Sequence, residues 1–152
     1  MKVALVTGGG SGIGRSAALE LNKIDFTVYV VGRREEELIK TSSLATNNNH
    51  KIIPIKTDIT IGSQVIALFD KIKSDHGRID LLFNNAGMGA PRVPIEELKE
   101  EDWRKTVDVN LTGSFLCSQQ AIKLMKNQSP QGGRIVNNGS VSAHSPRPDT
   151  IA

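Results

Sequence analysis

The residues whose types and spacing indicate a function most clearly are glycines near the N-terminus, between an apolar run and a helical pattern. Glycine permits positive φ angles and lets a ligand approach the backbone closely. The helix that follows would present free N–H groups and its positive dipole end to the loop, where a diphosphate can bind. Its place between a first strand and a first helix makes the pattern specific for a dinucleotide. The segment is Thr7-Gly8-Gly9-Gly10-Ser11-Gly12-Ile13-Gly14.

Two arginines stand where the second strand should meet the adenine ribose. A dinucleotide without a 2′-phosphate usually meets an acidic residue about 20 residues after the glycines. Here the strand ends in Gly32-Arg33-Arg34. A guanidinium suits a phosphate but offers no acceptor to a ribose hydroxyl. The pair therefore predicts NADP(H) over NAD(H), and the alternative is that both arginines are solvated residues at a helix start.

Strand and helix patterns alternate along the chain and would position these groups. Short apolar or β-branched runs predict five strands, and Pro54 in the third favours an edge position for it. Apolar residues at helical spacing predict helices between the strands. This order indicates an α/β fold with a doubly wound parallel sheet in a single domain, 1–152. The expected strands are 3–6, 26–31, 52–55, 79–83 and 134–136, and the expected helices are 13–23, 34–45, 60–74 and 95–126.

The last of these helical stretches carries an apolar stripe in which residues recur every four positions. Its members are Trp103, Val107, Leu111 and Phe115, with Ile122 and Met125 beyond. We expect this stripe to pack inside the molecule. The alternative is that it docks onto a partner.

Composition narrows the function classes. Lys and Arg number 19 against 16 Asp and Glu, a formal charge of +3 without a run of five or more like charges, so neither nucleic acid nor a membrane surface is expected as a partner. The single cysteine, Cys117, excludes an intramolecular disulfide and favours a reducing compartment, so the expected location is cytoplasmic. No metal site is predicted. Cys117 itself is expected to be a small core residue.

With these motifs in place, the chain resembles the classical short-chain dehydrogenase/reductase family over its whole length. The glycine spacing Thr7-Gly8-x-x-x-Gly12-Ile13-Gly14 is similar to that family's own signature. Asp58-Ile59 follows the third strand, Asn84-Asn85-Ala86-Gly87 follows the fourth, and Asn110 and Ser140 complete the series. The resemblance implies a Rossmann-like, three-layer α/β/α fold, incomplete at the C-terminus of this chain.

The resemblance also implies roles for individual residues. The Asp58 side chain and the Ile59 N–H would contact the adenine, and Asn85, Ala86 and Gly87 would support the cofactor. Ser140 and Asn110 would be catalytic, Ser140 by hydrogen-bonding the substrate oxygen and Asn110 by anchoring a water in a proton relay. Taken singly, Asp58 could cap a helix, Asn84 and Asn85 could form a turn, Asn110 could be an ordinary helical residue, and Ser140 could be one hydroxyl of a Ser-rich loop.

Two features depart from the family's pattern. Asn138 stands where relatives usually carry an apolar residue. The family's catalytic Tyr follows the Ser by thirteen positions, which is position 153 here, and a Lys would fall at 157, whereas this chain ends at Ala152. The only Tyr is Tyr29, inside the second strand, and His144 is a weak substitute donor. We therefore expect the 152 residues to be inactive alone and to be the N-terminal part of a longer single-domain protein.

The function expected of the parent protein is NADP(H)-dependent interconversion of an alcohol and a carbonyl, with a small-molecule substrate and a homo-oligomeric assembly. The alternatives are an NADP(H)-binding module without redox activity and a regulatory subunit. Ser140 and Asn110 favour the enzyme, because a pure binding module has little need of them.

Overall fold

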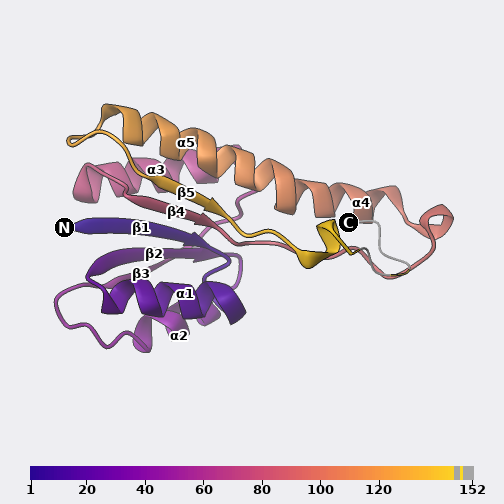
Figure 1. The fold of residues 1–152 in the computed structure, drawn as a ribbon, viewed down its shortest axis with the longest axis horizontal. Coiled ribbons are helices and arrows are strands. Elements are labelled where there is room, and N and C mark those ends of the chain that lie inside the picture. The colour runs from indigo at the N-terminus through magenta and orange to yellow at the C-terminus, as the bar shows by residue number, and fades with distance from the viewer. Residues whose placement is uncertain (146–147, 149–152) are drawn as a thin grey trace.

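The computed structural model describes residues 1–145 and 148. It contains a five-stranded parallel sheet in the order β3-β2-β1-β4-β5, which confirms the predicted doubly wound topology. The strands are β1 Lys2–Thr7, β2 Phe26–Gly32, β3 Ile52–Lys56, β4 Leu81–Asn84 and β5 Arg134–Asn137. The main helices are α1 Gly12–Lys23, α2 Glu35–Ser43, α3 Gly62–His76, α4 Glu100–Val107 and α5 Gly113–Asn127. Helices α1 and α2 cover one face of the sheet, and α3 and α5 cover the other (Figure 1).

The central strands are apolar without interruption because both of their faces are buried. Val3 and Leu5 of β1 belong to the core on the side of α3 and α5, whereas Ala4 and Val6 belong to the core on the side of α1 and α2. Pro54 lies in β3, which is an edge strand as predicted. The side of β3 that faces away from β2 has no neighbouring strand, so a missing N–H there removes no hydrogen bond between strands.

The long helical stretch begins later than the sequence predicts. A short 3₁₀ turn, Ile95–Glu97, is separated from α4 by extended residues, and α4 is joined to α5 by a π-helical turn, Asp108–Thr112. In that turn the Gly113 N–H donates to the Asp108 carbonyl, five residues back. Single π turns are often found at functional sites.

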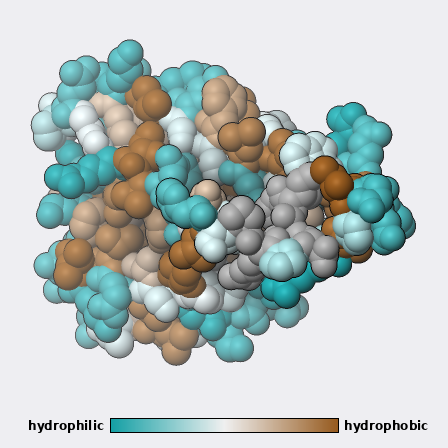
Figure 2. Space-filling model, turned by 45° about the vertical axis from the view of Figure 1, so that its right-hand side comes forward, coloured by the Kyte–Doolittle hydropathy of each residue, from teal (hydrophilic) through white to brown (hydrophobic). Residues whose placement is uncertain are grey.

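Most of the apolar stripe on this stretch does not pack inside the molecule, so that expectation was wrong except for Met125, which is buried. Trp103 is 41% exposed, Leu111 67% and Phe115 56%. The buried residues of α5 comprise three small ones, Gly113, Cys117 and Ala121, and two large ones, Leu124 and Met125. An added Cβ on Gly113 would lie 2.6 Å from Ile59 Cδ1, so the start of α5 lies too close to the loop after β3 for a larger side chain at that position. Space-filling Figure 2 likewise shows hydrophobic residues at several places on the surface.

The single cysteine is a core residue, as predicted. Cys117 is fully buried, and burial raises the pKa of its thiol to about 12, because the thiolate would lose its hydration. Within the described residues, no helix is both long and apolar enough to cross a bilayer.

Tyr29 is buried in β2 and donates a hydrogen bond of 2.5 Å to Asp75 Oδ2 on α3. This bond, with another from Lys71, lowers the pKa of the Asp75 carboxyl below its usual value near 3.8. A lowered pKa contributes stability that is present above the unfolded-state pKa and is lost as pH falls through the folded-state value. We expect Tyr29→Phe to narrow the difference in Tm between pH 7 and about pH 3. Thermal melts at both pH values test this, and an unchanged difference would contradict it.

Candidate functional site

The glycine loop connects β1 to α1 and brings backbone atoms into contact. Gly8 has a φ of +66°, a conformation that residues with a Cβ rarely adopt. An added Cβ on Gly14 would lie 2.3 Å from the Gly8 carbonyl oxygen and 2.6 Å from Asn85 Nδ2. Glycine is thus required at Gly14 by close packing between the start of α1 and the loop.

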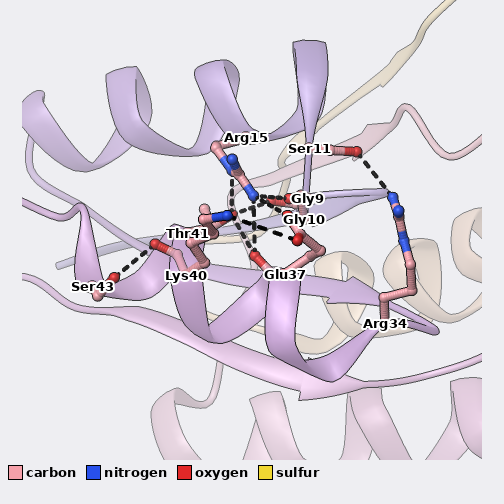
Figure 3. A network of polar contacts seen from close by, with 9 residues as sticks. All are labelled: Gly9, Gly10, Ser11, Arg15, Arg34, Glu37, Lys40, Thr41 and Ser43. Atoms are coloured by element: carbon pink, nitrogen blue, oxygen red, sulfur yellow. Dashed lines mark hydrogen bonds and ion pairs between the residues drawn. The ribbon is translucent and has the colours of Figure 1, made fainter.

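The first turn of α1 is open to an anion. Ser11 is the residue before the helix, and its side chain makes no capping hydrogen bond to the helix N–H groups. Its Oγ instead accepts from Arg34 Nη2 at 3.3 Å, across the entrance between the two helices (Figure 3). The free N–H groups at this helix start have the geometry that binds phosphate.

The loop carbonyls are held by two residues from the flanking helices (Figure 3). Arg15 of α1 donates to the Gly10 carbonyl and, through Nε, to Thr41 Oγ1 at 3.0 Å. The buried Thr41 hydroxyl on α2 donates to the Gly9 carbonyl at 2.9 Å. These contacts fix the loop between α1 and α2.

A cleft of about 600 Å³ lies beside this loop at the carboxyl ends of the strands. Nine of the residues predicted to bind the cofactor line it: Gly8, Ser11, Arg33, Arg34, Asp58, Ile59, Asn85, Ala86 and Gly87. The other four, Thr7, Gly12, Ile13 and Gly14, lie outside the lining. Arg33 and Arg34 are exposed, and within the described part of the chain neither forms an ion pair with a carboxylate.

Asp58 does not cap α3, because the residue before that helix is Ile61. Its Oδ1 accepts from the Thr60 N–H at 3.0 Å and from the Thr60 hydroxyl at 2.7 Å, which holds the loop after β3. The Ile59 side chain is 6% exposed, so its backbone is the part that a ligand in the cleft can contact.

Thr7 supports the far wall of the cleft. Its hydroxyl accepts from the N–H groups of Asn85 and Ala86, both at 2.9 Å, and so joins the end of β1 to the loop after β4. The Asn85 amide donates to the Thr7 carbonyl at 3.0 Å and accepts from Asn138 Nδ2 at 3.1 Å. The unusual Asn138 therefore makes a polar contact with a predicted cofactor residue.

A second cleft, of about 1070 Å³, contains both predicted catalytic residues, Ser140 and Asn110. Ser140 Oγ accepts from the Ser142 N–H at 3.1 Å, so its own hydrogen is free to be donated. Asn110 lies in the π turn, and its side chain accepts from the Met88 N–H at 2.9 Å and donates to the Met88 carbonyl at 2.8 Å. Residues 85–88 line both clefts, so the two clefts adjoin at this segment.

Neither substitute proton donor lines this second cleft. Tyr29 is buried and bonded to Asp75, which together with burial raises its pKa above the ordinary value. His144 is exposed beyond the 3₁₀ turn Val141–Ala143 and is absent from the lining.

Sequence reasoning missed three residues that organise the first cleft: Arg15, Glu37 and Thr41. Glu37 lines the cleft, and its Oε2 lies 2.6 Å from Arg15 Nη2. The one available signal was that Arg15 directly follows the last glycine of the loop, with an acidic triplet, Glu35–Glu37, opening α2.

Comparisons with known proteins agree with this geometry. The chain is 38% identical over 141 residues to a 3beta-hydroxysteroid dehydrogenase of Mediterraneibacter gnavus, covering 93% of this chain and 50% of the relative. Among solved structures, NAD+-bound xylitol dehydrogenase has a TM-score of 0.90 at 30% identity, covering 97% of this chain and 56% of that one. A metagenomic short-chain oxidoreductase in complex with NADP also has a TM-score of 0.90, at 27% identity, and the match covers 98% of this chain and 66% of that one.

The chain spans about half the length of the curated relatives it matches, between 50% and 59% for several of them. The profile of the short chain dehydrogenase family matches residues 2–152. The strand order of the chain, its glycine loop and this match together show that it belongs to the short-chain dehydrogenase/reductase family.

Proposed function

We propose that the protein is an NADP(H)-dependent oxidoreductase that interconverts an alcohol and a carbonyl. The observation that carries the cofactor preference is the pair Arg33 and Arg34, two exposed guanidinium groups that line the cleft beside an open helix start and form no ion pair with a carboxylate of residues 1–145. The observation that favours an enzyme over a binding module is the second cleft, where Ser140 and Asn110 lie together.

The residues of the first cleft fit a dinucleotide. The N–H groups at the start of α1 suit its diphosphate, and the arginines suit the 2′-phosphate that distinguishes NADP(H). Asp58 and the Ile59 N–H line the same cleft and would contact the adenine, and the segment 85–87 leads toward the second cleft. The bound nicotinamide would supply or accept a hydride.

The chain's own residues would orient the substrate. Ser140 would donate its free hydrogen to the substrate oxygen, because the Ser142 N–H already occupies one lone pair of its Oγ. Asn110 would hold the loop at Met88 that forms part of the cleft wall. No residue among those lining the cleft is a Tyr, so we propose that residues 1–152 do not catalyse turnover without a further proton donor.

The names of similar proteins support this substrate class, since both a hydroxysteroid and xylitol are alcohols. We also propose a homo-oligomer, supported by the exposed apolar residues Trp103, Leu111 and Phe115 on α4, the π turn and α5.

The cofactor proposal is tested by Arg33→Asp in the full chain. Losing a charge-assisted hydrogen bond to a phosphate costs about 2 kcal/mol, so we expect NADPH to bind about 30-fold more weakly. NADH affinity should change less than about threefold, because NADH has no 2′-phosphate. Fluorescence titrations with both cofactors measure this. Lys51→Asp, an equal charge reversal just before β3, is the matched control. Equal losses for NADPH and NADH would count against the arginine argument.

A further inference from the structure

Glu37 places a carboxylate in the cleft proposed to bind NADP(H), where a negative charge is unfavourable beside the 2′-phosphate. It lines the same cleft as Arg33 and Arg34, and its side chain is 33% exposed. An uncompensated carboxylate there would repel a 2′-phosphate. It would also offer the acceptor that a ribose 2′-hydroxyl prefers.

Arg15 neutralises this carboxylate from outside the cleft. Its Nη2 lies 2.6 Å from Glu37 Oε2, while Lys40 Nζ is 4.0 Å from the other carboxylate oxygen. Arg15 is absent from the cleft lining, and its guanidinium also donates to the Gly10 carbonyl and, through Nε, to Thr41 Oγ1 (Figure 3). The hydrogen bond from Arg15 is also the largest cause that lowers the pKa of Glu37, so the carboxylate is ionised and paired.

The pairing is built into the packing of the two helices. An added Cβ on Gly10 would lie 3.1 Å from Glu37 Cβ, so the first turn of α2 sits directly on the glycine loop. Glu37 therefore stays close to the cleft. Whether its charge is neutralised by Arg15 then determines how strongly the cleft binds a phosphate.

We propose that Arg15 is a positioning residue for cofactor specificity, which acts through Glu37 and makes the cleft prefer the dinucleotide carrying a 2′-phosphate. This inference rests on the proposed function. Without the Arg15 charge, Glu37 would face the phosphate with only the more distant Lys40 as an ion-pair partner. NADPH binding would weaken, and NADH binding would be kept or improved.

The test is a set of NADPH and NADH fluorescence titrations on the full chain. Arg15→Gln removes the charge but keeps an N–H donor for the Gly10 carbonyl. We expect it to weaken NADPH binding about tenfold and to change NADH binding less than about twofold. Adding Glu37→Gln to this variant should restore NADPH affinity to within about threefold of the wild type, because the unpaired charge is then gone.

Two further variants separate charge from structure. Arg15→Lys keeps the charge and should hold the ratio of NADPH to NADH affinity within about threefold of the wild type. Lys23→Met removes a cation from the other end of α1, where its partner is Glu20, and should leave the ratio unchanged. If Arg15→Gln fails to fold, Glu37→Gln alone decides the question. It should raise NADPH affinity about twofold, and a fall would overturn the inference.

Failure of the inference is distinguishable from failure of the proposed function. A wild-type chain that prefers NADPH, with equal losses of both cofactors in Arg15→Gln and no recovery in the double variant, would overturn the inference alone. A wild-type chain that binds neither dinucleotide, or prefers NADH, would overturn the proposed cofactor and this inference together.

Discussion

Gly14→Ala is expected to weaken binding of NADPH and of NADH alike, by more than about 100-fold, in the full chain. The added methyl group would lie 2.3 Å from the Gly8 carbonyl oxygen and 2.6 Å from Asn85 Nδ2. The nearer of these is a backbone atom, so the glycine loop must shift away from the diphosphate geometry. Overpacking of this kind costs about 1–3 kcal/mol. For a chain of this size that lowers Tm by about 3 to 9 °C. Titration of both cofactors and a thermal melt measure the two effects.

Two other glycines serve as controls for this experiment. An added Cβ on Gly62 meets nothing within 4 Å, and Gly62 begins α3, so Gly62→Ala should be neutral or slightly stabilising. Gly12 also has open space but a φ of +51°, so Gly12→Ala should cost about 1–2 kcal/mol through strain alone. If Gly14→Ala affects binding no more than Gly12→Ala does, close packing is not the reason for the glycine.

Ser140→Ala is expected to lower kcat by a factor of about 10² to 10³ in a form of the protein that supplies the further proton donor, because residues 1–152 alone are proposed not to turn over. Removing one hydrogen-bond donor from a reacting oxygen has this effect in enzymes where it has been measured. Because Ser140 lines the second cleft and not the first, the Kd for NADPH should stay within about twofold of the wild type. The assay is NADP+-dependent oxidation of a panel of secondary alcohols, combined with a cofactor titration.

Ser142 provides the matched control, because its hydroxyl lies in the same cleft two residues away. It contacts Ser140 Oγ through its backbone N–H, which an alanine retains. Ser142→Ala should therefore keep kcat within about threefold of the wild type. A large loss in Ser142→Ala together with a small one in Ser140→Ala would move the catalytic assignment to Ser142.

The sheet and most of the first cleft could be predicted because they follow from local patterns. Val3, Leu5 and Val6 form an uninterrupted apolar run, which indicates a strand buried on both faces. The edge position of β3 follows from Pro54 alone. Once the strand order is known, Arg33 and Ser11 must meet at the same edge of the sheet, since parallel strands end on one side.

The remaining features depend on distances between elements, which a local pattern does not contain. A four-residue spacing predicted that Leu111 and Phe115 would be buried, but α5 turns a different set of residues inward, among them Gly113, Cys117 and Ala121. The Arg15–Glu37 pair is equally non-local, because it exists only where the glycine loop brings α1 against α2. Charged residues at exposed helix starts are common, so neither residue stands out in the sequence.

The Thr7 hydroxyl has a mechanical consequence. It accepts hydrogen bonds from the backbone N–H groups of residues 85 and 86 and so holds the carboxyl end of β1 against the segment that follows β4. We call these two joined chain segments, residue 7 and residues 85–86, the cleft floor. If the first cleft opens to admit a ligand, we expect the helices and loops around this floor to move, and not the floor itself. Relaxation measurements on the backbone amides should find the floor stiff on the millisecond timescale and the entrance near Arg34 the faster-moving part.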